Sequence, residues 1–174
     1  MPKLIKNGQL VDDAAQILVL DETQAPEALT LPEGPLFVPL AVWQAHKGQL
    51  SGRADVGVWL DSHENVDELA EDLDGITAIA LNFPKFTDGR AYSAAALLRS
   101  RHGFKGEIRA IGDVLRDQFF FMRRCGFDAI QPKAGKYSDA QLEEALASLK
   151  DFSTPYQAAI DQPEPLFRRT QRTA

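Results

Sequence analysis

The chain has few residues that could hold a redox centre. It contains one cysteine, Cys125, and three histidines in 174 residues. A single thiol forms no disulfide within the chain, no iron–sulfur or four-cysteine zinc site and no C-x-x-C redox pair. The G-x-G-x-x-G, P-loop and G-x-S-x-G patterns are also absent. We therefore expect no bound metal and no nicotinamide, flavin or nucleotide cofactor.

Long apolar runs are missing as well. No stretch approaches the roughly 18 apolar residues of a membrane-spanning helix, and the N-terminus, MPKLIKNGQLVDD, lacks the apolar core of a signal peptide. A formal net charge of −6 argues against a general nucleic-acid binder. These features predict a cytoplasmic protein that contacts neither membrane nor nucleic acid.

The charges are unevenly distributed along the chain. Residues 1–84 carry four bases and 14 acids, residues 85–124 carry nine bases and four acids, and residues 125–174 carry six bases and seven acids. The basic middle segment has two interpretations. Its arginines either pair with acids of the N-terminal half or lie on solvated helix faces, or they form a binding site for an oxyanion.

The hydrophobic pattern predicts an α/β fold. The segments LIK and QLV flank Asn7-Gly8, a pair favoured in two-residue hairpin turns. After this hairpin, short and largely continuous apolar runs alternate with helical patterns, as in strands covered on both faces; the runs are residues 36–43, 56–60, 78–83, 108–112 and 127–131. We expect a mainly parallel sheet of βα units, either an open three-layer sheet or a partial barrel.

The helical patterns and the prolines define the expected domain. Helices are expected over residues 64–73, 91–102 and 114–125, and from the capping-box sequence SDAQ at Ser138 to residue 150. Further on, Pro155, Pro163 and Pro165 interrupt any helix. We predict one α/β domain over residues 1–150, followed by a C-terminal extension, residues 151–174, that is mobile or draped over a neighbouring surface.

Polar residues follow the predicted strands at the edge where parallel α/β sheets bind ligands. This rim is expected to collect Asp61, His63, Lys85, Arg90, Asp113, Arg116 and Lys133. Arginine and lysine near a helix N-terminus favour anions, so anion binding is assigned to Lys85, Arg90, Arg116 and Lys133. Acid–base catalysis is assigned to Asp113 and His63.

Each of these residue types also has a structural interpretation. Asp88 can cap the helix that follows it, with Arg90 as its ion-pair partner. Asp113 can be an N-cap rather than a catalytic carboxylate. His63 can be a surface or capping histidine, since no other histidine stands at a metal-ligand spacing from it.

The helix expected over residues 114–125 is apolar around much of its circumference. Residues 119–122 read FFFM, so the helix is either buried on two sides or contacts another chain, which makes it a candidate homodimer or partner surface. Cys125 follows two arginines but lies where a helix dipole opposes a thiolate. We expect a buried structural cysteine.

Several blocks of the sequence resemble one bacterial family, the domain of unknown function 934 family. They are LIKNGQLVDD, EGPLFVPLAVW, DVGVWL, NFPKFTDGRAYSAAALLR and GEIRAIGDVLRDQFFFMRRCGFDAI, and the resemblance covers about residues 3–150. Members are described as oxidoreductases of sulfite reduction, and their genes commonly neighbour the gene of the sulfite reductase haemoprotein. The resemblance implies a role in sulfate assimilation leading to cysteine.

Reduction of sulfite to sulfide takes six electrons, which a chain with one cysteine and no cofactor motif is poorly equipped to carry. We therefore expect an accessory protein of assimilatory sulfate and sulfite reduction, a partner of the sulfite reductase haemoprotein whose basic segment binds an anion or docks on an acidic surface. The alternative is a small α/β enzyme acting on an anionic sulfur- or phosphate-containing compound. A third possibility is a scaffold whose dimer surface is its function.

Overall fold

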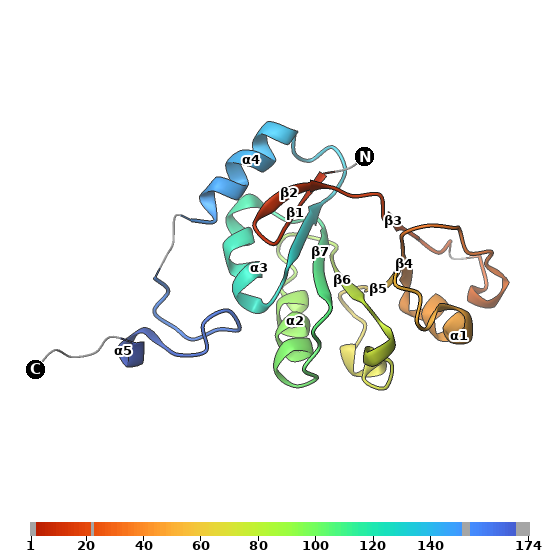
Figure 1. The fold of residues 1–174 in the computed structure, drawn as a ribbon. Helices are drawn as coiled ribbons and strands as arrows, with labels where there is room; N and C mark the ends of the chain where they lie inside the picture. The colour runs from red at the N-terminus through yellow and green to blue at the C-terminus, as the bar shows by residue number, and fades with distance from the viewer. Residues whose placement is uncertain (1–2, 22, 151–153, 170–174) are drawn as a thin grey trace, which may run out of the picture.

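The computed structural model describes residues 3–21, 23–150 and 154–169. In this part of the chain, eight strands form one sheet in the order β2-β1-β8-β7-β6-β5-β4-β3. From β3 to β8 all neighbouring strands pair in parallel and follow one another in sequence order. The sheet is curled into a half-barrel (Figure 1), which decides between the two arrangements expected from the sequence.

The strands largely match the apolar runs. They are β4 (Leu36–Pro39), β5 (Val56–Leu60), β6 (Ala78–Phe83), β7 (Glu107–Gly112) and β8 (Ala129–Pro132), with the short β3 (Gln16–Ile17) at one edge. At the other edge, β1 (Lys3–Lys6) and β2 (Gln9–Asp12) form the expected antiparallel hairpin. Asn7 and Gly8 have φ of 49° and 74°, the positive values that its tight turn requires.

The helices lie on the convex side of the sheet (Figure 1). They are α1 (Leu40–Leu50), α2 (Arg90–Ser100), α3 (Phe119–Cys125), α4 (Asp139–Ser148) and the single turn α5 (Leu166–Arg169). Alternate strand residues such as Val58, Ile79, Leu81 and Ile108 face them and are fully or almost fully buried in the main core. No helix of the described residues is long and apolar enough to cross a membrane.

Two predicted elements differ from the structure. The run over residues 36–43 is not one strand, because β4 ends at Pro39 and α1 begins at Leu40. All residues of this run except Ala41 are buried, and all are apolar, so the sequence shows no strand or helix period. The helix expected over residues 64–73 is replaced by two 3₁₀ turns, η2 (Val66–Leu69) and η3 (Leu73–Gly75). This segment carries many acids and no base that could support an α-helix through i,i+4 pairs.

The helix expected over residues 114–125 begins later than predicted. A 3₁₀ turn, η4 (Arg116–Gln118), precedes α3, which starts at Phe119. Phe119 and Met122 are fully buried, whereas Phe121 is 52% exposed. The capping box at Ser138 is confirmed, since its side chain accepts a hydrogen bond from the Gln141 amide at the start of α4.

The concave side of the half-barrel is covered by a strap, residues 13–20. The Leu18 amide donates to the Phe37 carbonyl at 2.9 Å, and the Trp59 indole donates to the Leu18 carbonyl at 2.7 Å. Beneath the strap, Phe37, Ala80 and Ile111 form a small apolar cluster, against which Ile17 packs. The strap therefore closes much of a face that a complete barrel would bury with further strands.

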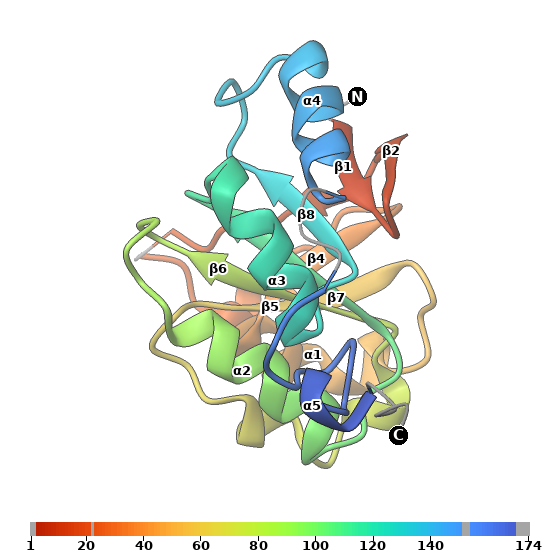
Figure 2. The same ribbon diagram turned by 90° about the vertical axis from the view of Figure 1, so that its left-hand side faces the viewer.

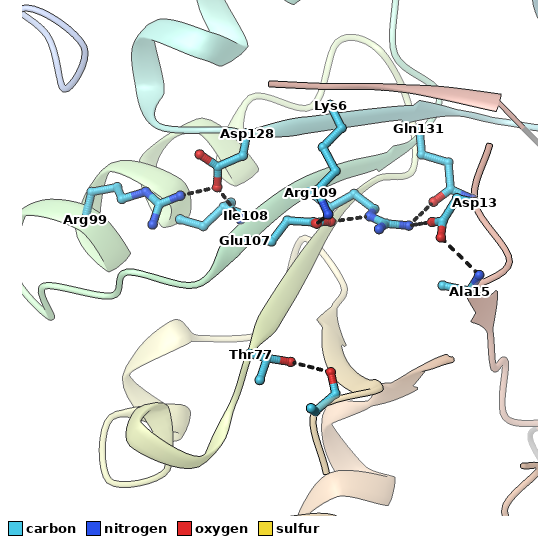
Figure 3. Close-up of polar contacts among 11 residues, drawn as sticks. Lys6, Asp13, Ala15, Thr77, Arg99, Glu107, Ile108, Arg109, Asp128 and Gln131 are labelled. Atoms are coloured by element: carbon cyan, nitrogen blue, oxygen red, sulfur yellow. Dashed lines mark hydrogen bonds and ion pairs between the residues drawn. The ribbon is translucent and has the colours of Figure 1, made fainter. Parts of the chain in front are cut away.

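A buried ionic cluster holds the strap in place (Figure 3). Arg109 on β7 is 4% exposed and lies over the Phe37 ring, 4.6 Å from its centroid. Its guanidinium donates to Glu107 at 2.7 Å and to Gln131 at 2.9 Å, and it pairs with Asp13 at the start of the strap. The Lys6 ammonium of β1 lies 2.5 Å from the Glu107 carboxylate and forms a further ion pair. One cluster therefore connects the hairpin, the sheet and the strap.

Residues 154–169 pass over α2 and α3 (Figure 2). The Arg124 guanidinium donates to the Gln157 carbonyl at 2.5 Å and lies 3.5 Å from the Asp161 carboxylate. The Ile160 amide donates to the Arg124 carbonyl at 3.1 Å. Residues 154–169 therefore lie against α3, whereas residues 151–153 and 170–174 of the predicted extension lie outside the described part of the chain.

Candidate functional site

The carboxyl ends of the parallel strands form one rim of the half-barrel, because parallel neighbours end at the same edge. Asp61 follows β5, Asn82 stands near the end of β6, Asp113 follows β7 and Lys133 follows β8. The strap ends beside them, because Ile17 and Val19 line the same hollow as the ends of β6, β7 and β8. The rim is thus the place at which polar side chains from several elements meet.

The largest hollow at the rim, the rim cavity, has a volume of about 740 Å³. One side is apolar, formed by Ile17, Val19 and Ile111. Its polar lining consists of Asn82, Asp113, Gln131 and Lys133. A volume of this size and a few convergent polar groups on an apolar wall are typical of small-molecule sites.

Asp113 holds two loops of the rim together. Its carboxylate accepts a hydrogen bond from the Phe86 amide at 3.1 Å and forms an ion pair with Lys136. The Lys136 ammonium, followed by the Phe86 amide, holds the pKa of Asp113 below its ordinary value, so the side chain is a carboxylate. This residue links the loop after β6 and the loop after β8 to the end of β7.

Lys133 is the exposed cation of the rim cavity. Its amide donates to the Gly112 carbonyl at 2.8 Å, which fixes its backbone beside β7. Its ammonium has no carboxylate partner at ion-pair distance among the described residues, and its charge contributes to the lowered pKa of Asp113. Because Asp113 already pairs with Lys136, these three residues leave a local excess of one positive charge.

Lys85 also has no ion-pair partner within the described ranges. It is exposed and follows Pro84, one of the residues that line the rim cavity. Its backbone carbonyl accepts from the Asp88 amide at 2.9 Å, which closes the turn before α2. The structure thus places the two lysines predicted to bind an anion in the loops that border one cavity.

A second, smaller hollow of about 170 Å³ adjoins the rim cavity and shares Asn82 with it. The Asn82 amide donates to the Asp61 carboxylate at 3.0 Å. Arg90, at the start of α2, donates to both Asp88 oxygens, at 3.0 and 2.6 Å, and to the Ser62 hydroxyl at 2.8 Å. The Arg90 guanidinium lowers the pKa of Asp88, so the two charges neutralise each other.

The paired geometry of Arg90 matches the structural interpretation given to it in the sequence. The Asp88 carboxylate also accepts from the Arg90 amide at 3.2 Å, although the N-cap position of α2 is Gly89, which has no side chain to cap it. Arg90 remains 60% exposed at its side chain. Its anion-binding role stays a prediction that requires a ligand to compete with Asp88.

His63 and Arg116 do not line the rim cavity. The His63 ring is 70% exposed and lies 3.5 Å from the Asp61 carboxylate. The Arg116 guanidinium points to α4, where it lies 3.4 Å from both the Ser148 hydroxyl and the Glu144 carboxylate. The structure therefore does not bring all the predicted site residues together.

The basic segment consists mostly of paired arginines. Of its nine bases, six arginines lie within ion-pair distance of a carboxylate: Arg90, Arg99, Arg101, Arg109, Arg116 and Arg124. In the described part of the chain, only Arg101 and Arg109 reach acids of the N-terminal half, Asp67 and Asp13. Pairing therefore explains most of the positive block, and the bases of this segment that have no ion-pair partner among the described residues are Lys85, Lys105 and Arg123.

Two features of the site carry no pattern in the sequence. Lys136 pairs with Asp113, 23 residues away in the sequence, and Asn82, which lines both hollows, donates to Asp61, 21 residues away. Neither contact follows a helical or strand spacing, so only the arrangement of the rim could reveal them. Within the described ranges, no three His, Cys, Asp or Glu residues cluster closely enough to hold a metal ion.

Comparison with known proteins gives one match. A family model described as "Bacterial protein of unknown function (DUF934)" matches residues 57–167, well over half of the chain. The matched region runs from β5 through the rim and α3 to the C-terminal segment. No curated protein and no solved structure matches the chain.

Proposed function

Since this chain belongs to the DUF934 family of bacterial proteins, we propose that it is an accessory protein of assimilatory sulfate and sulfite reduction that binds a small oxyanion at its rim cavity. It acts in the cytoplasm as a partner of the sulfite reductase haemoprotein and contributes to cysteine biosynthesis. The pathway follows from the family resemblance of the sequence blocks, and the ligand class follows from the rim.

The observation that carries the ligand class is Lys133. Its ammonium borders a cavity of about 740 Å³ and has no carboxylate partner within the described residues. Charge-assisted hydrogen bonds from lysine favour oxyanions such as sulfite, sulfate or phosphate. Asn82 and Gln131 line the same cavity and carry side-chain amides. The remaining volume leaves room for an anion larger than sulfite itself.

The same contacts favour binding over acid–base chemistry. A general acid needs a pKa near the working pH, whereas Lys136 and the Phe86 amide lower the pKa of Asp113. Arg90 would have to release Asp88 to hold a substrate. The enzyme alternative, with Lys85 and Arg90 holding an anion and Asp113 or His63 moving a proton, therefore has less support than the accessory role.

The binding of sulfite, measured by isothermal titration calorimetry, tests the ligand class. Lys133→Ala is expected to weaken sulfite binding at least about tenfold, because it removes the charge-assisted contact, which is worth roughly 1.5–3 kcal/mol. Lys105→Ala is the matched control, since Lys105 is an exposed lysine at the opposite end of β7 with no ion-pair partner in the described ranges.

The two variants must differ for the rim assignment to stand. Equal affinity in Lys133→Ala and wild-type protein would remove Lys133 from the site. If both variants bound sulfite equally weakly, the affinity would depend only on the net charge of the protein and not on Lys133.

A further inference from the structure

Exposed apolar side chains are concentrated in two helices and the C-terminal segment of the described chain. Seven large apolar residues of the described chain are more than a third exposed, and five of them lie on α2, α3 and the C-terminal segment: Leu97, Phe121, Tyr156, Ile160 and Phe167. Their exposed fractions range from 37% to 67%. The other two, Val19 and Phe86, belong to the strap and the loop after β6.

Two of these residues, Phe121 and Ile160, line a groove of about 470 Å³, the helix-face groove. Its walls are Ala96 of α2, Phe121 and Cys125 of α3, and residues 157–160 and 163 of the C-terminal segment. Phe121 packs edge-on against Tyr92, with 5.0 Å between ring centroids, and Arg124 anchors Ile160 and Gln157 to α3. The C-terminal segment is thus attached to α3, next to which it passes in Figure 2.

The elements that form the groove carry an excess of positive charge. Helix α3 and residues 154–169 carry four arginines and two carboxylates. Arg123 and Arg168 have no carboxylate at ion-pair distance among the described residues and instead lie over the rings of Phe120 and Phe167, at 5.6 and 5.8 Å. Arg123 lines a neighbouring hollow together with Ile160, and Arg168 belongs to the C-terminal segment that forms one wall of the groove. An apolar groove formed by elements that carry such arginines is typical of protein interfaces, where aromatic residues and arginine are enriched.

Charge argues against a second copy as the occupant. A two-fold dimer through this face would bring the same arginines of both copies together, and like charges across an interface cost affinity. The favourable partner is a surface whose apolar side chains are flanked by carboxylates. Burial of Phe121 and Ile160 would then stabilise the contact, and the arginines would steer it.

We propose that the helix-face groove is the docking site for an acidic, apolar-centred surface of the partner protein. This inference rests on the proposed function, which supplies the partner that can be tested. The groove and the rim cavity have no lining residue in common, so the chain can hold an anion and a partner at the same time.

Binding of purified sulfite reductase haemoprotein, measured by surface plasmon resonance at low salt, tests this docking site. Phe121→Glu and Arg168→Glu are each expected to weaken binding at least about tenfold, because one removes the apolar anchor and the other reverses a steering charge. Both side chains are exposed, so the variants keep the fold, which circular dichroism verifies. Phe86→Glu is the matched control, a similarly exposed phenylalanine away from the groove, and is expected to bind like wild type.

The other possible outcomes of this experiment show which part of the proposal is wrong. If wild-type protein binds and both groove variants bind equally well, the docking site is wrong and the partnership stands. If wild-type protein does not bind the haemoprotein, the partnership in the proposed function is wrong, and the docking proposal falls with it. If sedimentation velocity shows a dimer that Phe121→Glu dissociates, a second copy occupies the groove and the proposal is overturned.

Discussion

Replacing Arg109 by methionine is expected to lower the free energy of unfolding by about 3–5 kcal/mol. The substitution keeps much of the apolar stem but leaves the carboxylates of Glu107 and Asp13, which are 11% and 19% exposed, without their guanidinium partner. Lys6 still reaches Glu107, whereas Asp13 has no second cationic partner among the described residues. Urea unfolding followed by tryptophan fluorescence measures the loss.

Arg101→Met is the control for this prediction. Its guanidinium is 65% exposed and lies 3.4 Å from Asp67, so its removal is expected to cost less than about 1 kcal/mol. Hydrogen exchange adds a local measurement. The Leu18 amide of the strap donates to the Phe37 carbonyl of β4, and in Arg109→Met this amide is expected to exchange faster. A loss as small as that of Arg101→Met would show that the cluster does not hold the strap.

Gly112→Ala is the second substitution with a large expected effect, a loss of about 2–4 kcal/mol in unfolding free energy. Gly112 has a φ of +97°, and a Cβ added there would lie 2.5 Å from both the Asn82 side-chain oxygen and the Phe83 carbonyl. An alanine at this positive φ has a strained backbone, and its Cβ also clashes with the Phe83 carbonyl. The Phe83 backbone cannot move away without separating β6 from β7. The same shift would displace Asn82 and narrow the rim cavity.

Gly135→Ala separates these two causes. Gly135 also has a positive φ, +78°, but a Cβ added there would meet no atom within 4 Å. It is expected to cost only about 1–2 kcal/mol, the strain of the backbone conformation alone. Thermal unfolding measures the loss of stability in both variants. Equal losses would show that the close contact at Gly112 is not the main cause of the destabilisation.

The strands could be predicted where burial decides the pattern. The runs at residues 56–60 and 78–83 have the bounds of β5 and β6, because both faces of these strands are covered. The change from strand to helix after Pro39 could not be predicted, because the run over residues 36–43 is wholly apolar and has no period. Curling of the sheet depends on strand order and crossovers, which no local pattern encodes.

The position of the rim could be predicted from the sequence, but the ion pairs between its charged side chains could not. The residues after β5 to β8 lie at one edge, as parallel topology requires. Which cation stays unpaired depends on contacts such as Lys136 with Asp113 and Asp88 with Arg90. The pair between Arg109 and Asp13 spans 96 residues of sequence, so only the folded strap brings it together.

Growth of a strain that lacks this gene, with sulfate, sulfite or sulfide as the only sulfur source, tests the central claim most directly. The account predicts growth on sulfide and none on sulfate or sulfite, because the missing protein acts at sulfite reduction. A plasmid with the wild-type gene or with Lys105→Ala should restore growth on all three, and one with Lys133→Ala should not. Growth of the deletion strain on all three sources would contradict the account.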